Sequence, residues 1–453
     1  MRTFRGGVHP HDAKVSGSGK IEDAALPPKV IIPLQQHLGG PAQSVVEVGA
    51  TVTKGQKIGE ASGFVSANIH ASISGKVTEI ADYLYPNPLG RTALSVVIES
   101  DGKDEWTDAI KPYVEEPDDL FSGIELLSSQ QILDIIRDAG IVGMGGASFP
   151  THVKLSIPPG KKIDTIILNG VECEPYMTPD HRLMLEEPGK VVHGLRIIMK
   201  ATGVSKGYIG IESNKPDAIR AMTEEAKREV NIGVVPLKVK YPQGWENMLI
   251  KVILNREVPP GGLPLDIGVV VCNVGTTAAI SDAVRFGYPL IERAISVTGP
   301  GIKQPKNLRV RIGTPFSDLI EQCGGFNGTP RKLIAGGPMM GFAMFDMNVP
   351  VVKGTTNILI FSDKDVGSWE SQACIRCGRC VDVCPVGLVP RMIGLLSQKG
   401  RFEDAEEYFP LDCKECGCCA YACPAKIPLV QLIQFAKSDI IARQRAAQAA
   451  GNR

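Results

Sequence analysis

The chain has 453 residues, of which 43% are hydrophobic, so it is too long for one core and is expected to form three or four domains. Its 49 Lys and Arg residues balance 49 Asp and Glu residues, so no global charge attracts a polyanion and we expect no nucleic-acid partner. No apolar run approaches the roughly 20 residues that cross a bilayer, so we expect no transmembrane segment.

The first predicted module is a β domain, assigned to residues 1–110. Residues 30–98 are rich in β-branched side chains punctuated by Gly and Pro, a pattern typical of strands and turns. Within residues 45–80, two short strand-and-turn units echo each other. This segment resembles the barrel-sandwich fold of biotinyl and lipoyl carrier domains, which carry a modified lysine at a hairpin tip. The matching residues 61–66 include no lysine, so we interpret the module as structural.

A doubly wound α/β domain of the Rossmann-like kind is predicted over residues 120–290. Ser128 and Gln131 form a capping box at the start of a predicted helix, and Gly140 can end it in the left-handed conformation. Four apolar runs of strand length then alternate with helical stretches, which indicates a mostly parallel sheet. The runs are KIDTIILNG, KGYIGIES, LKVKYP and IGVVVCNVG. Such sheets bind ligands at the carboxyl ends of their strands.

Two further domains complete the predicted architecture. Residues 294–364 return to strands and turns with one short helix at PFSDLIEQCGG, which indicates a small module of the β-grasp type. Residues 368–445 are assigned to a helical domain that contains most of the cysteines. Its last helix has an apolar stripe that either covers its own domain, the commoner case, or docks on a partner. The stripe consists of Leu429, Leu432, Ile433, Ile440 and Ile441.

Eight of the twelve cysteines form the pattern C-x2-C-x2-C-x3-C-P twice over. Three thiolates on a tight loop can bind three iron corners of a cubane, and the fourth, which precedes a proline, ligates the cluster of the other loop. We therefore predict two [4Fe-4S] clusters and electron transfer. The expected ligands are Cys374, Cys377, Cys380 and Cys423 for cluster 1, and Cys413, Cys416, Cys419 and Cys384 for cluster 2.

Zinc and disulfides are the alternatives for these cysteines. Zinc usually takes two C-x2-C pairs, so loops of three cysteines followed by Cys-Pro favour clusters. Disulfides need an oxidising compartment, whereas the polar N-terminus MRTFRGGVHPHDAK has no signal-peptide core. Cys418 lies outside the pattern and is interpreted as a spare thiol, packed or facing solvent. The isolated Cys173, Cys272 and Cys323 are expected to be small core residues.

A glycine-rich turn, GIVGMGGASFPTHVKL, spans residues 140–155. Its glycines let the backbone approach a ligand, and amides that enter the next helix can bind a phosphate. A turn that merely changes direction would also need glycine. Polar residues near the turn and at the predicted strand ends favour a ligand site. They are Lys154, Asn169, Glu172, Glu174 and Asn273.

These segments resemble two related families. GMGGASFPTHVKL, ILNGVECEP, YPQGWENML and VCNVGTT are similar to the flavin-binding domain of the NADH-oxidising subunit of complex I. The matching segments there run close to GRGGAGFPTGxKW, NADExEPG, GEETAL and NNVET. The C subunit of the Rnf complex, an ion-pumping ferredoxin:NAD oxidoreductase, is more similar still and over nearly the whole chain. FRGGVHPHDAK, IIPLQQHLGGPA, SANIHASISGKV and both cysteine motifs carry that resemblance.

The resemblance implies two sets of binding residues, and this sequence matches the complex I pattern incompletely. FMN would be surrounded by Gly143, Gly145, Gly146, Lys154, Asn169, Glu172 and Asn273, with the loop amides and Lys154 near its phosphate. NAD(H) would lie near Phe149 and Glu174, with Glu246 as a looser match. This sequence departs from the complex I pattern at His152 and Tyr176, where that family has glycine, and at Gly275, where it has glutamate.

The resemblance also implies a redox function within an enzyme complex. Electrons would pass between the [4Fe-4S] clusters, FMN and NAD(H), with the flavin converting between one-electron and two-electron transfer and no general acid or base. The implied partners are the membrane subunits of the complex and its ferredoxin-like subunit. The chain would be peripheral, on the cytoplasmic face of the bacterial membrane.

Two rival functions stay open. A soluble corrin reductase combines the same flavin and cluster modules, but the resemblance implies that its chain begins near the glycine turn, whereas here the β module leads. An electron-relay adaptor would use only the clusters and carry a vestigial nucleotide fold. The departures at Tyr176 and Gly275 keep that interpretation open.

Overall fold

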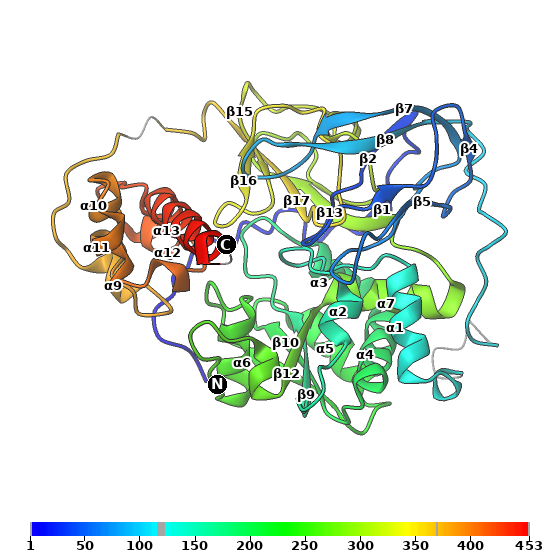
Figure 1. Ribbon diagram of the computed structural model, residues 1–453, viewed down its shortest axis with the longest axis horizontal. Coiled ribbons are helices and arrows are strands. Elements are labelled where there is room, and N and C mark those ends of the chain that lie inside the picture. The colour runs from blue at the N-terminus through cyan, green and yellow to red at the C-terminus, as the bar shows by residue number, and fades with distance from the viewer. Residues whose placement is uncertain (1, 116–122, 368–369, 452–453) are drawn as a thin grey trace.

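The computed structural model describes residues 2–115, 123–367 and 370–451 (Figure 1). In this view the strands of the N-terminal module and those of residues 292–362 lie above the α/β domain, and the cysteine-rich helices form a group at one side. None of the helices in the described residues is long and apolar enough to cross a membrane.

The N-terminal module has two small antiparallel sheets around one core, as predicted. Their strand orders are β2-β8-β7-β4 and β3-β5-β6. Val30 and Ile32 of β2 and Val96 and Ile98 of β8 enter this core at alternate positions, the period of a half-buried strand. The bounds are β2 Lys29–Pro33, β3 Gln43–Ser44, β4 Thr51–Val52, β5 Lys57–Glu60, β6 Ile69–His70, β7 Gly75–Leu84 and β8 Thr92–Ser100.

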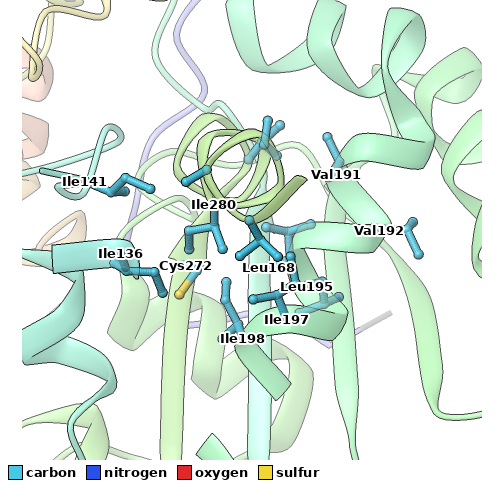
Figure 2. Packing of buried hydrophobic residues seen from close by; sticks show 14 of the residues in the cluster. Ile136, Ile141, Leu168, Val191, Val192, Leu195, Ile197, Ile198, Cys272 and Ile280 are labelled. Atoms are coloured by element: carbon cyan, nitrogen blue, oxygen red, sulfur yellow. The ribbon is translucent and has the colours of Figure 1, made fainter. Parts of the chain in front are cut away.

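The α/β domain is built on four parallel strands in the order β11-β10-β9-β12. Ile166 and Leu168 of β9 enter one core and Ile167 enters the other, so both faces of the sheet are covered. Figure 2 shows the larger core, in which Leu168 packs with Leu195 and Ile280. The predicted doubly wound sheet is confirmed. Its strands are β9 Thr165–Gly170, β10 Gly207–Glu212, β11 Ile232–Leu237 and β12 Val269–Asn273. Its helices are α1 Ser129–Asp138, α2 Thr151–Leu155, α3 Pro179–Glu186, α4 Pro188–Thr202, α5 Pro216–Ala226, α6 Glu246–Leu254 and α7 Val274–Phe286, with 3-10 turns at Ile124–Leu126 and Pro264–Ile267.

Two local signals in this domain are confirmed and one is wrong. The capping box of α1 is closed by hydrogen bonds of 3.2 and 2.8 Å between Ser128 and Gln131. Gly140 follows the helix with φ 64°. The strand expected at LKVKYP instead lies just before it, at β11, whose Pro236 is tolerated because β11 is an edge strand.

The predicted β-grasp module is a mixed sheet with one helix, α8 Phe316–Gln322. Its strand order is β1-β14-β13-β17-β15-β16, in which β1 comes from the N-terminal segment. Phe316 and Leu319 of α8 are buried in its core. The bounds are β1 Ile21–Asp23, β13 Glu292–Thr298, β14 Lys306–Arg311, β15 Pro330–Ala335, β16 Phe342–Met344 and β17 Asn357–Ser362.

The cysteine-rich domain is helical, and its last helix covers it. Ile433 and Ala436 of α13 are fully buried and pack with Ile393 and Leu396 of α10, so the commoner interpretation of the apolar stripe holds. The bounds are α9 Arg379–Asp382, α10 Pro390–Gln398, α11 Phe402–Glu406, a 3-10 turn at Pro410–Asp412, α12 Cys418–Ala422 and α13 Leu429–Gly451.

The first residues run along the other domains. Val8 forms an antiparallel bridge with Tyr241 of the α/β domain, and the Gly7 amide donates to the Val383 carbonyl of the cysteine-rich domain at 2.8 Å. Lys14 Nζ donates to three carbonyl oxygens of the segment after β9, at 2.8, 2.8 and 2.7 Å. This segment therefore ties two domains together, and the domain boundaries read from the sequence stay predictions.

Candidate functional site

The glycine-rich turn lies between α1 and α2 and presents its backbone to solvent. The Gly143 amide donates to the Phe149 carbonyl at 2.9 Å, which closes the turn. Its tip, residues 145–147, is exposed. A Cβ on Gly146 would meet no protein atom within 4 Å, so a ligand can approach the backbone there.

Gly145 packs against Asn273 at the end of β12. A Cβ at position 145 would lie 2.5 Å from Asn273 Nδ2, closer than side chains can pack. Asn273 Oδ1 caps α7 by accepting from the Thr276 amide at 3.2 Å, and its Nδ2 donates to Asp180 Oδ2 at 2.7 Å. The Asp180 amide donates to Glu172 Oε1 at 2.7 Å. One chain of contacts thus joins the turn, Asn273 and Glu172.

Glu172 is a buried carboxylate with an unsatisfied oxygen. Burial raises its pKa to about 7, and the charge of Lys14, whose Nζ is 4.0 Å from Oε2, opposes the shift. Oε2 has no hydrogen-bond partner among the described residues. Since an unpaired buried oxygen is costly, a bound molecule that donates a hydrogen bond to it would be stabilised here.

Lys154 and Asn169 lie beside the segment that begins α6. Lys154 Nζ is 3.4 Å from Glu246 Oε2, and Asn169 Nδ2 donates to the Gly244 carbonyl at 2.7 Å. Asn169 of β9 is directly opposite Asn273 of β12 in the sheet. The predicted FMN residues therefore meet at the carboxyl ends of neighbouring parallel strands.

Two buried cations hold the glycine turn from the β-grasp side. Arg293 Nη2 donates to the Met144 carbonyl at 3.2 Å, and its Nη1 donates to the Lys353 carbonyl. Lys353 Nζ donates to the carbonyls of Asn68 and Gly140, each at 2.7 Å. Burial lowers the pKa of Arg293 to about 10 and that of Lys353 to about 7. The position of the turn thus depends on three domains.

The residues predicted to contact NAD(H) are less closely gathered. Phe149 belongs to the glycine turn, and Glu246 to the group around Lys154. The Glu174 carboxylate instead accepts from the amides of Met339 and Met340, at 3.1 and 2.8 Å, in the loop before β16. Burial raises its pKa to about 7. Phe149 and Glu246 therefore lie with the predicted flavin residues, whereas Glu174 is directed toward the β-grasp loop.

The three departures from the complex I pattern have local structural reasons. His152 Nε2 lies 3.1 Å from the Phe64 carbonyl, so it docks the N-terminal module on α2. Tyr176 has a positive φ of 68°, which favours glycine, and its ring meets Phe361 edge-on at 5.7 Å. A Cβ on Gly275 would lie 2.8 Å from Cε of Met144, so a longer side chain there would require the Met144 side chain to shift.

The thiols of the first cysteine group come from both motifs. Cys374 and Cys380 of the first motif pack with Cys423 of the second. Burial raises the pKa of Cys380, and the neighbouring charges of Cys423 and Cys374 add to it. Cys377 lies on the same loop and is exposed.

The second group also combines cysteines of both motifs. Burial raises the pKa of Cys413 to about 11, with Cys416 and Cys384 as charged neighbours. Cys419 has these three thiols as neighbours, and burial raises its pKa too. The structure therefore brings Cys423 to the first loop and Cys384 to the second, while Cys419 also packs beside Cys423. The assignment of all eight cysteines to two clusters stays a prediction.

Both cysteine loops have the same backbone. Arg376 and Glu415 have φ values of 58° and 56°, and each amide donates to the sulfur of the first cysteine of its motif at 3.4 Å. Gly378 and Gly417 follow with φ values of 77° and 80°. The sequence repeat is thus a structural repeat, and it supplies amide-to-sulfur bonds of the kind that tune cluster potentials.

The second cysteine group faces the α/β domain. The Tyr241 hydroxyl donates to the Cys416 carbonyl at 2.8 Å, and Trp245 lines the recess that these cysteines surround. A Cβ on Gly417 would lie 2.8 Å from the Met339 carbonyl oxygen, so the β-grasp loop closes the same side. This group is therefore enclosed between domains.

The cysteines outside the motifs are packed. Cys418 is 1% exposed, which confirms a packed spare thiol. Cys272 and Cys323 are buried core residues as expected, and burial raises the pKa of each to about 11. Cys173 is only partly buried by area, and its sulfur accepts from the Gly244 amide at 3.3 Å. It packs against the core as expected, and it also contacts the segment that precedes α6.

These groups fit the cofactors that the sequence suggests. The open amides of Gly145 and Gly146 and the cation of Lys154 suit a phosphate, and Glu172 Oε2 can accept from a bound ring. Among the described residues, no three His, Cys, Asp or Glu side chains converge as ligands of one ion. A cubane does not need that convergence, because each thiolate binds a different iron corner.

The site residues that the sequence analysis missed include Lys14, Asp180, Tyr241, Arg293 and Lys353. Asp180 has a weak local signal, since it follows Pro179 at the start of α3. Lys14 and Tyr241 lie in segments that carry the family resemblance, but no local pattern gives them a role, because each bonds to a segment far away in the chain.

Family models match four successive parts of the chain. They are the RnfC barrel-sandwich hybrid domain over residues 2–103, the Nuo51 FMN-binding domain over 136–282, the SLBB domain over 295–343 and the 4Fe-4S dicluster domain over 373–427. The C subunit of the proton-translocating ferredoxin:NAD(+) oxidoreductase complex of Clostridium ljungdahlii is 52% identical over 97% of this chain and 94% of its own length. The chain belongs to the RnfC family.

Other comparisons agree with the RnfC assignment. The C subunit of the Na(+)-translocating ferredoxin:NAD(+) oxidoreductase complex of Acetobacterium woodii is 47% identical over 98% of both chains. A crystal structure of NAD+-reducing [NiFe]-hydrogenase in the H2-reduced state has a TM-score of 0.50 over 78% of this chain and 74% of that one. At 17% identity, this likeness concerns the fold alone. The family models confirm the predicted domain types and the predicted FMN and [4Fe-4S] cofactors.

Proposed function

We propose that this RnfC chain transfers electrons between NAD(H) and a one-electron carrier, as the peripheral subunit of a membrane-bound, ion-translocating ferredoxin:NAD oxidoreductase. One observation carries the proposal. The second cysteine group packs against the α/β domain through Tyr241 and Trp245, so a cluster there adjoins the domain of the glycine turn. The names of the relatives support NAD(+) and ferredoxin as the redox partners of the complex.

The chain's own residues would bind and orient the cofactors. FMN, when bound, supplies the conversion between the electron pair of a nicotinamide and the single electrons of the clusters. The amides of Gly145 and Gly146 and the cation of Lys154 would hold its phosphate, while Asn273 would keep the turn in place. Glu172 would accept a hydrogen bond from the ring.

Phe149, Glu174 and Glu246 remain the proposed NAD(H) residues. Phe149 and Glu246 lie with the flavin residues and would contact the nucleotide. Glu174, held by two amides of the β-grasp loop, would act by positioning that loop.

The proposed place of the chain is the cytoplasmic face of the bacterial membrane, where other subunits would contribute the ion pathway. Support comes from the relatives, which are named as subunits of ion-translocating complexes. The expected direct partners are the membrane subunits and a ferredoxin-like subunit. Pull-down of the tagged chain from detergent-solubilised membranes should recover these subunits, and recovery of the chain alone would oppose this assignment.

Anaerobic bleaching tests the redox proposal. Purified holoprotein should contain about eight irons and eight sulfides, as two cubanes require. Addition of NADH without oxygen should bleach both flavin and cluster absorbance. In Gly145→Val protein, NADH should leave the clusters oxidised while dithionite still reduces them. If the protein contains clusters but NADH does not reduce them even after FMN has been added back, the electron-relay adaptor is favoured instead.

A further inference from the structure

The two cysteine groups differ in exposure. The ligands predicted for cluster 2 are buried or partly buried, and Tyr241, Trp245 and Met339 close their surroundings. The group predicted for cluster 1 includes Cys377, which is exposed. Figure 1 shows α9, which follows the Cys377 loop, at the outer edge of the cysteine-rich domain. Of the two groups, the first is therefore the one that has a cysteine open to contact by a partner protein.

The exposed loop carries concentrated positive charge. Residues 374–391 contain three arginines and one aspartate, in a chain whose charges otherwise balance. Arg376 and Arg379 are exposed, and neither forms an ion pair within the described residues. In the second loop, by contrast, Glu415 offsets Lys414 in sequence and is itself paired with Lys437. Over the equivalent residues 413–430, two lysines and one glutamate leave one positive charge, so the first span is the more positive of the two.

An exposed apolar side chain lies beside this charge in sequence. Ile375, next to Arg376, is 68% exposed. An apolar centre within a charged rim is the usual composition of a protein interface, and small charged contacts are typical of transient redox encounters. A surface of solvated charge alone would not need Ile375.

We propose that residues 374–379 are the docking surface for an acidic, protein-borne one-electron carrier, which would exchange electrons with the cluster that the first cysteine group would hold. The proposal rests on the proposed redox function and names its partner surface. In the step itself the reduced carrier would give up one electron, and the cluster held by Cys374, Cys377, Cys380 and Cys423 would accept it. The carrier is oxidised by one electron, no bond changes, and no proton moves. The arginines steer and hold the carrier's carboxylates.

Equilibrium binding tests the surface without requiring turnover. The probe is a purified acidic ferredoxin with two [4Fe-4S] clusters, titrated anaerobically into holoprotein at several salt concentrations. The double variant Arg376→Glu and Arg379→Glu should bind at least roughly tenfold more weakly and lose most of the salt dependence. The matched control Arg220→Glu makes the same change of charge on an exposed arginine of α5 and should bind like the parent.

A second measurement covers the case in which the double variant loses cluster 1. Hydrogen exchange of the unaltered holoprotein should slow over residues 375–382 when the ferredoxin is added. Equal binding by the double variant and the parent, or protection only elsewhere, would overturn the proposal. So would binding of the parent to anionic lipid vesicles with none to the ferredoxin.

The two proposals fail separately. A holoprotein that binds the ferredoxin through these arginines but is not bleached by NADH refutes the redox function and leaves the surface intact. If NADH bleaches the holoprotein but substitution of Arg376 and Arg379 does not change ferredoxin binding, the docking surface is refuted and the redox function stands.

Discussion

Gly145 and Gly146 are neighbours in the glycine turn and differ in what surrounds them. Gly145 packs on Asn273, whereas the space beyond Gly146 is open. The first glycine is therefore needed by the protein and the second only by a ligand. Sequence analysis could identify both as glycines of a binding turn but could not separate these roles, because Asn273 reaches the turn only in the folded chain.

Alanine at each position separates the two roles. Gly145→Ala should destabilise the apoprotein by about 1–3 kcal/mol through overlap with Asn273 and should also weaken FMN binding. Gly146→Ala should leave the apoprotein stable and weaken FMN binding alone. Thermal unfolding and flavin fluorescence quenching measure the two effects, and Gly63→Ala, which also meets open space, serves as the control. Tight FMN binding by Gly146→Ala would show that the ligand does not approach there.

Glu172 makes the stability of the apoprotein depend on pH. Its pKa is raised from 4.5 to about 7, so between these values the folded chain holds a proton that the unfolded chain has lost. This contribution to stability is therefore present below pH 4.5 and is lost as the pH rises toward 7.

Glu172→Gln should remove that dependence. Apparent melting temperatures of the apoprotein, measured between pH 5 and pH 7.5, should fall less with rising pH in the variant than in the parent. Glu47→Gln, the same change on an exposed residue, should follow the parent. If the variant and the parent have the same pH profile, Glu172 is ionised throughout that range.

At the scale of elements, the contact between the cysteine loops and the α/β domain includes one buried hydroxyl. Tyr241 is 2% exposed and donates to the carbonyl of Cys416, a predicted ligand of cluster 2. The strands and helices of the α/β domain were largely predictable, since β9, β10 and β12 lie within apolar runs of strand length. The contact between Tyr241 and Cys416 was not predictable, because the two residues are far apart in the chain and no local sequence pattern relates them.

Tyr241→Phe removes this bond while keeping the ring. The unpaired Cys416 carbonyl should cost about 1 kcal/mol of stability, and the paramagnetic spectrum of cluster 2 should change while that of cluster 1 does not. Tyr208→Phe on β10 is the control. A change confined to cluster 1 would mean that the clusters are assigned the wrong way round.

At the scale of the whole molecule, each cysteine motif completes the other's group. Cys423 packs with the first loop, and Cys384 neighbours Cys413 and Cys416 of the second. The exchange was expected from the two Cys-Pro endings, and the fold accommodates it because α9 and α12 lie in contact.

Single serine substitutions test the exchange. Cys384→Ser should damage the cluster of the second loop and Cys423→Ser that of the first, as read from iron content and from electron paramagnetic resonance of the reduced protein. Cys418→Ser should leave both clusters intact, because that thiol is outside the motif. Damage to the cluster of each cysteine's own loop would refute the exchanged assignment.

The sequence alone determined what short-range patterns encode: the capping box of α1, the alternating strands of the α/β domain, the glycine turn and the paired cysteine motifs with their cofactor class. Only the tertiary structure decided that Asp180 links Asn273 to Glu172, that Lys353 and Arg293 hold the turn, that β1 joins a distant sheet, and that one cysteine group is enclosed while the other includes the exposed Cys377. The reason is physical. Hydrophobic period and turn chemistry act within a few residues, whereas burial and hydrogen bonding of a side chain depend on whichever distant segment packs against it.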